Sequence, residues 1–277
     1  MSNKPGHQAR KRFGQNFLHD PGVIERIVRA INPKPDDAIV EIGPGLGAIT
    51  EEILAINPKL QVVELDRDLI PVLRTKFFNF PDFRIHEADA LTFDFSQLVD
   101  NGKPLRIIGN LPYNISTPLI FHLLSQASVV KDMHFMLQKE VVQRLAAVSG
   151  DNNYGRLGIM AQYFCKVQPL FEVGSGAFRP APKVDSAIVR LVPHETLPYP
   201  AKDFGTLKAV VRTAFNARRK TLRKALGGMI SVEQLRRLEI DDGLRPENLS
   251  LADFVRIADL LVDEKAEMTT GNEASDD

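Results

Sequence analysis

The chain has 277 residues, of which 44% are hydrophobic and 25% charged, so it has the composition of a globular protein with a full apolar core. Its formal net charge is zero, Cys165 is its only cysteine, and no apolar run is long enough to cross a bilayer. These features exclude an intrachain disulfide framework and argue against a thiolate-ligated zinc site. They predict a cytoplasmic protein without membrane segments, with one large domain or a large domain and a small appendage.

The zero net charge is the sum of opposed charged segments. The first twelve residues hold four bases and no acid, and residues 204–232 hold seven bases and no acid. The end of the chain, from residue 263, is acidic and poor in apolar residues, a composition typical of disorder. A basic run on its own is as consistent with a solvated surface as with phosphate contact.

Strand and helix patterns alternate strictly along the first half of the chain. The first helix is predicted over residues 21–31, with Asp20 as its N-cap and Pro21 in its first position. Further helices are predicted at 48–56, 68–77, 116–126 and 139–148, and strands at 37–42, 60–66, 83–89, 105–110 and 132–138. This alternation predicts an α/β fold with a doubly wound parallel sheet.

The pattern changes after residue 150. A helix is predicted at 154–164, followed by strands at 165–173 and 186–192 that a Pro-rich segment joins, which indicates an antiparallel pair at one sheet edge. Residues 192–203 have the composition of a linker, and beyond them only helical patterns occur, at 204–229, 232–240 and 251–262. We therefore expect a first domain at 1–199 with a basic N-terminal arm, a small all-helical domain at 200–265, and a disordered tail at 266–277.

A glycine-rich loop, Gly43-Pro44-Gly45-Leu46-Gly47, lies between the first strand of the predicted sheet and the next helix. Glycines at such a turn let the backbone approach a ligand closely. The spacing also satisfies the dinucleotide fingerprint, which would place a pyrophosphate at the helix N-terminus, and a turn without a ligand is a third interpretation. Glu41, just before the loop, would repel a pyrophosphate and would suit a ligand that carries an ammonium and a sulfonium.

Acidic residues stand at the ends of the next two strands. Glu64 ends the second strand, where a carboxylate can bind both hydroxyls of a ribose, and Asp89 ends the third, where it can accept a hydrogen bond from an adenine amino group. Each acid alone is consistent with a solvated strand end. Together with the glycine loop and Glu41, they fit S-adenosylmethionine better than NAD.

The fourth strand ends in Asn110-Leu111-Pro112-Tyr113, at the edge where an open α/β sheet binds its ligands. Methylation of an exocyclic amino group is difficult because the nitrogen lone pair is delocalised into the aromatic ring. The Asn110 side-chain oxygen and a backbone carbonyl held by Pro112, most simply that of Leu111, would accept both N–H bonds and stabilise the charge that develops on nitrogen. Tyr113 would stack on the flipped-out base. The alternative interpretation is an ordinary turn.

Further motifs narrow the interpretation. The chain also contains GQNFL at 14–18, EIGPG at 41–45, FRPAPKVDS at 178–186, FNARRKTLRKAL at 215–226 and RPENL at 245–249. With Asn110–Tyr113, this combination resembles the ribosomal RNA adenine dimethyltransferases over about residues 12–262. Within that family it resembles the branch that modifies small-subunit rRNA, and it fits less well the erythromycin-resistance branch, which modifies large-subunit rRNA.

The resemblance implies a Rossmann-like, S-adenosylmethionine-dependent methyltransferase that dimethylates N6 of two adjacent adenosines in the 3′-terminal hairpin of small-subunit (16S) rRNA. Its partner would be the immature small ribosomal subunit, and we expect a monomer. Phe178 would join Tyr113 in sandwiching the target base, although Phe178 by itself favours a hydrophobic plug. Cofactor contacts are expected from Asn16, Leu18, Glu41, Gly43, Gly45, Gly47, Glu64, Asp89 and Asn110.

Beside an RNA-modifying site, phosphate contact becomes the better interpretation of the basic helix, and we expect RNA contacts from Arg218, Arg219, Lys220 and Arg223. Three other functions compete. They are a resistance-type 23S rRNA adenine methyltransferase, a dehydrogenase, which rests on the glycine loop alone, and an assembly factor that mainly checks the small subunit. The histidines lack metal-ligand spacing, so no metal is assigned.

Overall fold

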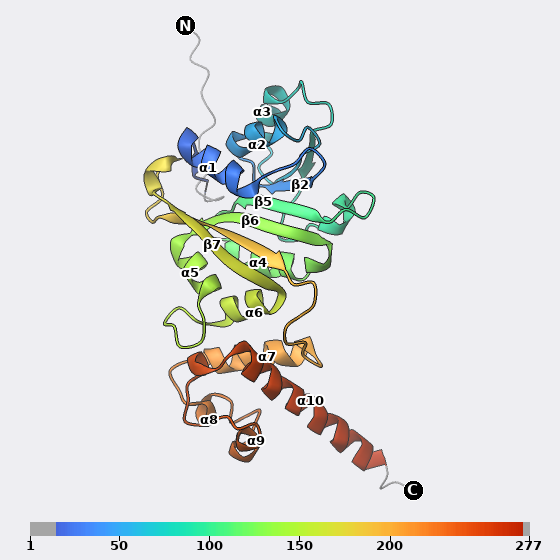
Figure 1. Ribbon diagram of the computed structural model, residues 1–277, viewed down its shortest axis with the longest axis vertical. Helices are drawn as coiled ribbons and strands as arrows, with labels where there is room; N and C mark the ends of the chain where they lie inside the picture. Colours follow the sequence, from blue (N-terminus) through green and yellow to red (C-terminus); the bar gives the residue numbers. More distant parts are fainter. Residues whose placement is uncertain (1–14, 274–277) are drawn as a thin grey trace. The chain divides into compact units, whose positions relative to one another are not determined.

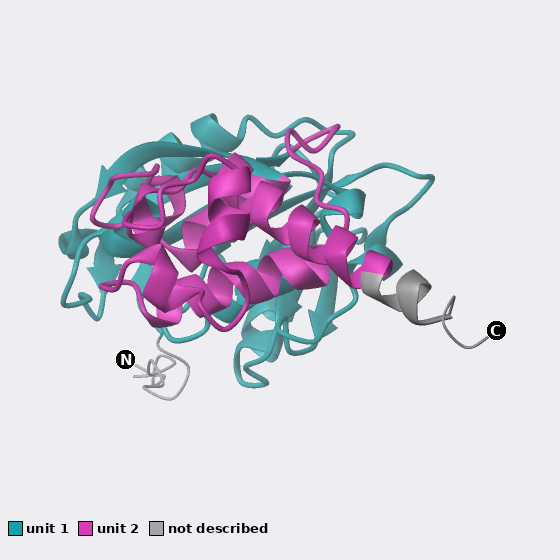
Figure 2. Cartoon of the chain, turned by 90° about the horizontal axis from the view of Figure 1, so that it is seen from below, with its two compact units in different colours: residues 1–143, 165–193 teal, residues 144–164, 194–277 magenta. Residues whose placement is uncertain are grey.

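The computed structural model describes residues 15–273, and the side chains of residues 15–267 (Figure 1). The chain forms two compact units, shown in Figure 2: a sheet unit of residues 1–143 and 165–193, and a helical unit of residues 144–164 and 194–277. The basic N-terminal arm and the last residues of the acidic tail lie outside the described residues.

The sheet unit is built on a seven-stranded sheet with the order β4-β3-β2-β5-β6-β9-β7. The first five of these strands are parallel, whereas β9 runs antiparallel to both of its neighbours, β6 and β7. The predicted parallel sheet with an antiparallel edge pair is therefore confirmed. The strands are β2 (Ala38–Ile42), β3 (Gln61–Glu64), β4 (Arg84–Glu87), β5 (Leu105–Asn110), β6 (Val130–Gln138), β7 (Cys165–Val173) and β9 (Ser186–Pro193).

Helices cover both faces of this sheet, with α1, α2 and α3 on one side and α4 on the other (Figure 1). Asp20 caps α1 as predicted, because its side chain accepts the N–H of Val23 and Pro21 begins the helix. The helices are α1 (Pro21–Ile31), α2 (Ala48–Leu54), α3 (Leu69–Lys76), α4 (Ser116–Leu124) and α5 (Lys139–Ala146), with 3₁₀ turns at Phe95–Leu98, Ala127–Val129 and Ser175–Ala177. Two short strands, β1 (Phe17–Leu18) and β8 (Phe178–Arg179), form a separate antiparallel pair.

The central strands β2 and β5 lie very close together at their carboxyl ends. A Cβ at Gly109, which pairs with Ile42, would lie 2.6 Å from the Ile42 carbonyl oxygen. Only glycine fits this approach without displacing the backbone. The loops that follow β2 and β5 therefore begin side by side.

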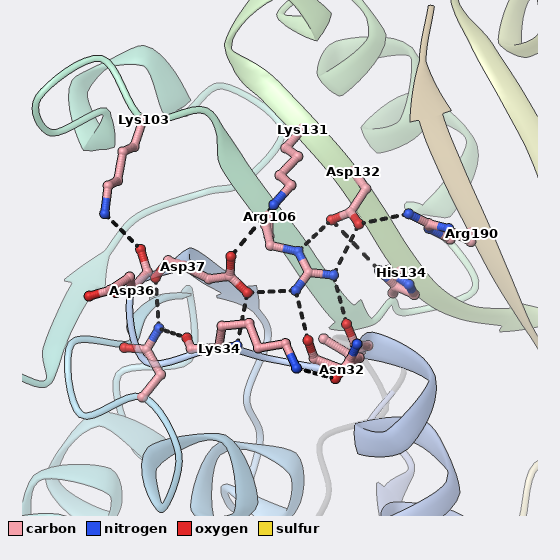
Figure 3. A network of polar contacts seen from close by, with 12 residues as sticks. Asn32, Lys34, Asp36, Asp37, Lys103, Arg106, Lys131, Asp132, His134 and Arg190 are labelled. Atoms are coloured by element: carbon pink, nitrogen blue, oxygen red, sulfur yellow. Dashed lines mark hydrogen bonds and ion pairs between the residues drawn. The ribbon is translucent and has the colours of Figure 1, made fainter.

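A buried arginine joins the strands at the opposite end of the sheet. Figure 3 shows the Arg106 guanidinium of β5 between two carboxylates: Nη1 lies 2.7 Å from Asp37 Oδ2, before β2, and Nε lies 2.9 Å from Asp132 Oδ1, on β6. Nη2 also donates to the Ile31 carbonyl at 2.7 Å, which satisfies one of the last carbonyls of α1. The neighbouring His134 is buried, and burial lowers its pKa to about 4, so it is neutral at pH 7.

The helical unit contains α6 (Arg156–Phe164), α7 (Phe204–Asn216), α8 (Leu222–Ala225), α9 (Val232–Arg237), a 3₁₀ turn at Pro246–Asn248, and α10 (Leu251–Glu273). The helical pattern at 204–229 is not one helix, because residues 217–221 form a turn between α7 and α8. Asn216 and Thr221 bracket this break, and both residue types favour helix ends over helix interiors. The prediction of a continuous basic helix was therefore wrong.

The units differ from the expected domains in two places. Residues 144–164, which include α6, belong with the C-terminal helices, and the chain returns to the helical unit at residue 194 rather than at 200. Helix α10 continues to Glu273, into the segment expected to be disordered. No helix within residues 15–273 is both long enough and apolar enough to span a membrane.

Replacing Arg106 with methionine is expected to lower the free energy of unfolding by about 3–5 kcal/mol, because buried Asp132 would lose its 2.9 Å ion pair and keep only the longer contact of 3.3 Å with Arg190. Denaturant unfolding measures this loss. Lys103→Met is the matched control, since the exposed Lys103 donates only to the Asp36 carbonyl, and surface changes of this kind alter stability by about 0.5 kcal/mol or less. Equal losses in the two variants would contradict a structural role for Arg106.

Candidate active site

A cavity of about 340 Å³ opens at the carboxyl ends of the parallel strands. It is lined by the segments that follow β2, β3, β4 and β5, together with residues just before α1. The lining lies within residues 15–18, 41–49, 63–69, 88–91 and 110–115. This is the edge at which open α/β sheets bind ligands.

The glycine loop leaves its backbone open to this cavity. Gly43 and Gly45 adopt left-handed φ values of 64° and 60°, and the only heavy atom within 4 Å of a Cβ at Gly43 would be the Asn110 carbonyl oxygen. A side chain at Gly43 would therefore take up ligand space. Gly47 does not line the cavity, and it must be glycine because a Cβ there would lie 2.7 Å from the Phe77 ring. Of the three glycines expected to contact the cofactor, Gly43 and Gly45 therefore line the cavity, whereas Gly47 is required by packing.

Four carboxyl groups line the cavity, and its described lining contains no lysine or arginine. The acids are Glu41, Glu64, Asp66 and Asp89. Such a cavity attracts a cation and repels a pyrophosphate. The charge pattern thus fits an ammonium and a sulfonium and opposes the dehydrogenase interpretation.

Glu41 is among the most deeply buried of these acids, with 2% of its surface exposed, as for Asp66. Its carboxyl accepts a hydrogen bond from Thr50 Oγ1 at 2.6 Å. Burial, with a smaller contribution from the charge of nearby Glu64, raises the pKa of Glu41 to about 7 against the opposing hydrogen bond from Thr50. Sequence reasoning missed Thr50, although its place in the helix after the glycine loop was a usable signal.

The next acids are oriented by backbone N–H groups. Glu64 Oε1 accepts the N–H of Asp66 at 2.8 Å, and Asp89 Oδ1 accepts the N–H of Leu91 at 2.9 Å. Burial raises the pKa of Glu64, while backbone N–H groups, that of Asp66 foremost, oppose the rise. Each carboxyl is thereby fixed with one oxygen engaged by its own loop.

The segment at residues 15–18, which we call the strap, lines one side of the cavity. Gln15 Nε2 donates to Asp66 Oδ2 at 2.8 Å, and a Cβ at Gly45 would lie 3.2 Å from the Phe17 ring. Leu18 is buried and lines the cavity. Sequence reasoning missed the contact between Gln15 and Asp66, because nothing local links positions 51 residues apart.

The strap also orients Asn110. Asn110 Nδ2 donates to the Asn16 carbonyl at 3.2 Å, which leaves Oδ1 of the amide as its acceptor on the cavity. The next residue, Leu111, donates its N–H to the Met136 carbonyl at 3.1 Å, whereas no described donor bonds to its own carbonyl. The Pro112 carbonyl, in contrast, accepts the N–H of Ile115. Asn110 Oδ1 and the Leu111 carbonyl therefore remain as two free acceptors.

The two rings predicted to sandwich the base lie in different surroundings. Tyr113 is half-buried, lines the cavity, and shares a hydrogen bond of 2.8 Å between its hydroxyl and Ser186 Oγ. Phe178 does not line the cavity: it is 2% exposed and belongs to the core cluster with Leu18 and Ile188. This geometry supports the hydrophobic-plug interpretation of Phe178 and not the sandwich. Ser186 received no role from sequence, although it ends the same motif.

The four expected RNA-binding residues, in the helical unit, divide into two pairs. Arg218 Nε lies 2.7 Å from Glu247 Oε2, and Arg223 Nε lies 3.7 Å from an oxygen of Asp242. Arg219 and Lys220 are exposed, and neither forms an ion pair with any described residue. Only the second pair is fully available to a phosphate.

The described side chains also contain no group of three or more His, Cys, Asp or Glu arranged for a metal.

Comparisons with known proteins agree with this geometry. A family model described as ribosomal RNA adenine dimethylase matches residues 6–263. The chain is 85% identical over 277 residues, the whole of both chains, to the ribosomal RNA small subunit methyltransferase A of Marinobacter nauticus. It also resembles the solved dimethyladenosine transferase of Plasmodium falciparum, with a TM-score of 0.74 and 29% identity over 90% of this chain and 97% of that one. The 23S rRNA methyltransferase ErmE shares the fold, with a TM-score of 0.68 and 24% identity over 89% of this chain and 100% of that one.

Glu41→Gln is expected to stabilise the fold while weakening the binding of S-adenosylmethionine. Glutamine keeps an acceptor for Thr50 without a buried charge, so the gain is at most about 3 kcal/mol above pH 7. Because the folded pKa of Glu41 is raised from 4.5 to about 7, its protonation favours folding at low pH and the advantage of glutamine should vanish below pH 4.5. Denaturant unfolding at several pH values and titration calorimetry measure the two effects.

The exposed Glu51, paired with Lys76 at 2.7 Å, provides the control variant Glu51→Gln, which should alter neither property appreciably. Unchanged cofactor affinity in Glu41→Gln would contradict the role assigned to Glu41.

Proposed function

The chain belongs to the ribosomal RNA adenine dimethylase family, and from this premise we propose that it dimethylates N6 of two adjacent adenosines in the 3′-terminal hairpin of small-subunit rRNA, with S-adenosylmethionine as methyl donor. The observation that carries the proposal is the pair of free acceptors at the end of β5, beside an acidic cavity. The names of the similar proteins support the substrate, since the relative at 85% identity is a small-subunit methyltransferase. The resemblance to ErmE, at 24% identity, supports only the fold.

The residues around the cavity fit S-adenosylmethionine. Glu41 provides negative charge for its cationic end, Glu64 hydrogen-bonds the ribose hydroxyls, and Asp89 accepts from the adenine amino group. Gly43 and Gly45 leave the backbone accessible. When bound, the cofactor supplies a methyl group that its sulfonium already activates, so the remaining work of the protein is to prepare the acceptor nitrogen.

Asn110 and Leu111 prepare that nitrogen. Asn110 Oδ1 and the Leu111 carbonyl accept the two N–H bonds of the target amine, which favours a pyramidal nitrogen with its lone pair released from the ring. The same oxygens stabilise the positive charge that develops as the N–C bond forms. Pro112 follows directly and restricts the backbone that holds the Leu111 carbonyl, and Tyr113 stacks on the base, a contact worth about 1–3 kcal/mol.

We further propose that the protein acts as a monomer in the cytoplasm on the immature small subunit. Arg219 and Lys220 contact rRNA phosphates, while Arg218 and Arg223 mainly hold the turn after α7 through Glu247 and Asp242. The single cysteine supports a reducing compartment.

Asn110→Ala is expected to reduce methyl transfer at least about 100-fold, because an acceptor for the developing charge is lost. Transfer of labelled methyl groups from S-adenosylmethionine to immature small subunits, followed by nucleoside analysis, measures the effect. RNA binding should stay near normal, which separates the enzyme from a factor that only checks assembly. The exposed Asn79→Ala serves as the control. Retained transfer in Asn110→Ala would exclude the role proposed for this amide.

Reversing the charges of Arg219 and Lys220 together should weaken binding to the subunit. It should also make the slope of log K against the logarithm of salt concentration shallower by about 1–2. Reversing Arg218 and Arg223 instead changes the same number of charges, but it should mainly lower stability because it breaks two ion pairs. Binding measured over a series of salt concentrations, with thermal unfolding of both variants, tests the distinction. Identical salt slopes in the two double variants would contradict it.

A further inference from the structure

We propose that Ser186 is a positioning residue for methyl transfer: its hydroxyl holds the Tyr113 ring in the orientation that stacks on the target adenine. This inference rests on the proposed function, because it assigns a cause to the placement of the stacking ring. It concerns a residue that contacts neither the cofactor cavity nor the reacting nitrogen. Ser186 is absent from the lining of the cavity, whereas Tyr113 is part of it.

The hydrogen bond between the two residues joins a rigid element to a loop. Ser186 begins β9, is fully buried, and pairs in register with Gln138 of β6 and Val173 of β7. Tyr113 stands in the loop after β5, outside any regular element. Because a strand with neighbours on both sides moves little, Ser186 provides a fixed point for the phenol oxygen 2.8 Å away.

The Tyr113 ring is thereby fixed at both ends. Its own backbone carbonyl accepts a hydrogen bond from Ser116 Oγ at 3.3 Å, and its hydroxyl is bound to Ser186. A tyrosine side chain has two rotatable bonds, and its phenol oxygen lies on the axis of the second, so holding that oxygen fixes where the ring lies through the first bond. The phenol O–H prefers the plane of the ring, so a hydrogen bond to the fixed Ser186 hydroxyl also favours one ring plane. The ring face then stays available to a base, since its polar end is already satisfied.

This role also explains the motif at residues 178–186. Its first residue, Phe178, pairs with Leu18 and so supports the strap, while its last residue, Ser186, supports Tyr113. Near the end of the motif, the Asp185 carbonyl accepts the N–H of Lys139 at 3.0 Å, which ties the motif to the end of β6. The motif therefore supports the two sides of the active site without entering it.

The first test is a double-mutant cycle of Ser186→Ala, Tyr113→Phe and both together, assayed on immature small subunits. Each single variant should lower kcat/KM for the subunit about 3- to 10-fold, the effect of one ordinary hydrogen bond, and the double variant should lose no more than the worse single one. The KM for S-adenosylmethionine should not change. Ser186→Ala should unfold near the wild-type temperature, whereas Tyr113→Phe should unfold earlier because it leaves the buried Ser186 hydroxyl without its partner.

The second test reports on the ring directly. The second test uses an RNA hairpin with 2-aminopurine in place of the target adenine, whose fluorescence should be quenched by stacking on Tyr113 in the wild type. Ser125→Ala is the control and should show the same quenching, because the Ser125 hydroxyl donates to the His122 carbonyl, away from Tyr113. Quenching should be weaker in Ser186→Ala. Full activity and full quenching in Ser186→Ala would overturn the inference, as would losses that add in the double variant. Absence of methyl transfer by the wild type would overturn the proposed function itself, and the inference with it.

Discussion

The guanidinium of Arg106 fixes the register of the three central strands β2, β5 and β6 relative to one another. It bonds to Asp37 before β2 and to Asp132 on β6, so a slip of either neighbour past β5 would break a buried ion pair. The same register places Ile42 opposite Gly109 and Asn110 opposite Met136 at the other end of the sheet. The glycine loop and the segment Asn110–Tyr113, which we call the catalytic loop, therefore start at the same edge of the sheet, which is the condition for a shared cavity.

The alignment of these strands brings the acids of the cavity together, and the most informative of them is Glu41. Glu41 is buried where its charge opposes folding, and its bond to Thr50 offsets only part of that cost. No described basic side chain lines the cavity to neutralise it. A buried carboxyl without a protein cation is explained by a ligand that brings the cation, and S-adenosylmethionine brings two. The cost to folding at Glu41 is thus consistent with the ligand role proposed for it.

Sequence predicted the parts of the site that depend on strand ends. The stretch Leu105–Asn110 reads as a strand because of its apolar residues Leu105, Ile107 and Ile108. Once the sheet is parallel, Glu41, Glu64 and Asp89 must meet at one edge. Sequence did not predict the contacts between segments that are distant along the chain. The burial of Phe178 against Leu18 and the ion pair of Arg218 with Glu247 depend on tertiary pairing, for which local patterns carry no signal. For the same reason, sequence did not predict that residues 144–164 belong with the C-terminal helices.

The catalytic loop is held so that it presents only selected groups to the substrate. One N–H of the Asn110 amide is occupied by the strap, which turns Oδ1 of the amide toward the cavity, and the hydroxyl of Tyr113 is occupied by β9. What remains toward the base is two acceptor oxygens and a ring face. An amino group satisfies both acceptors, whereas a keto oxygen at the same position would face them without a donor, at the cost of unpaired polar groups. In the proposed function, the arrangement that activates an adenine amine would therefore also disfavour a guanine or a hypoxanthine, so one geometry would account for both rate and specificity.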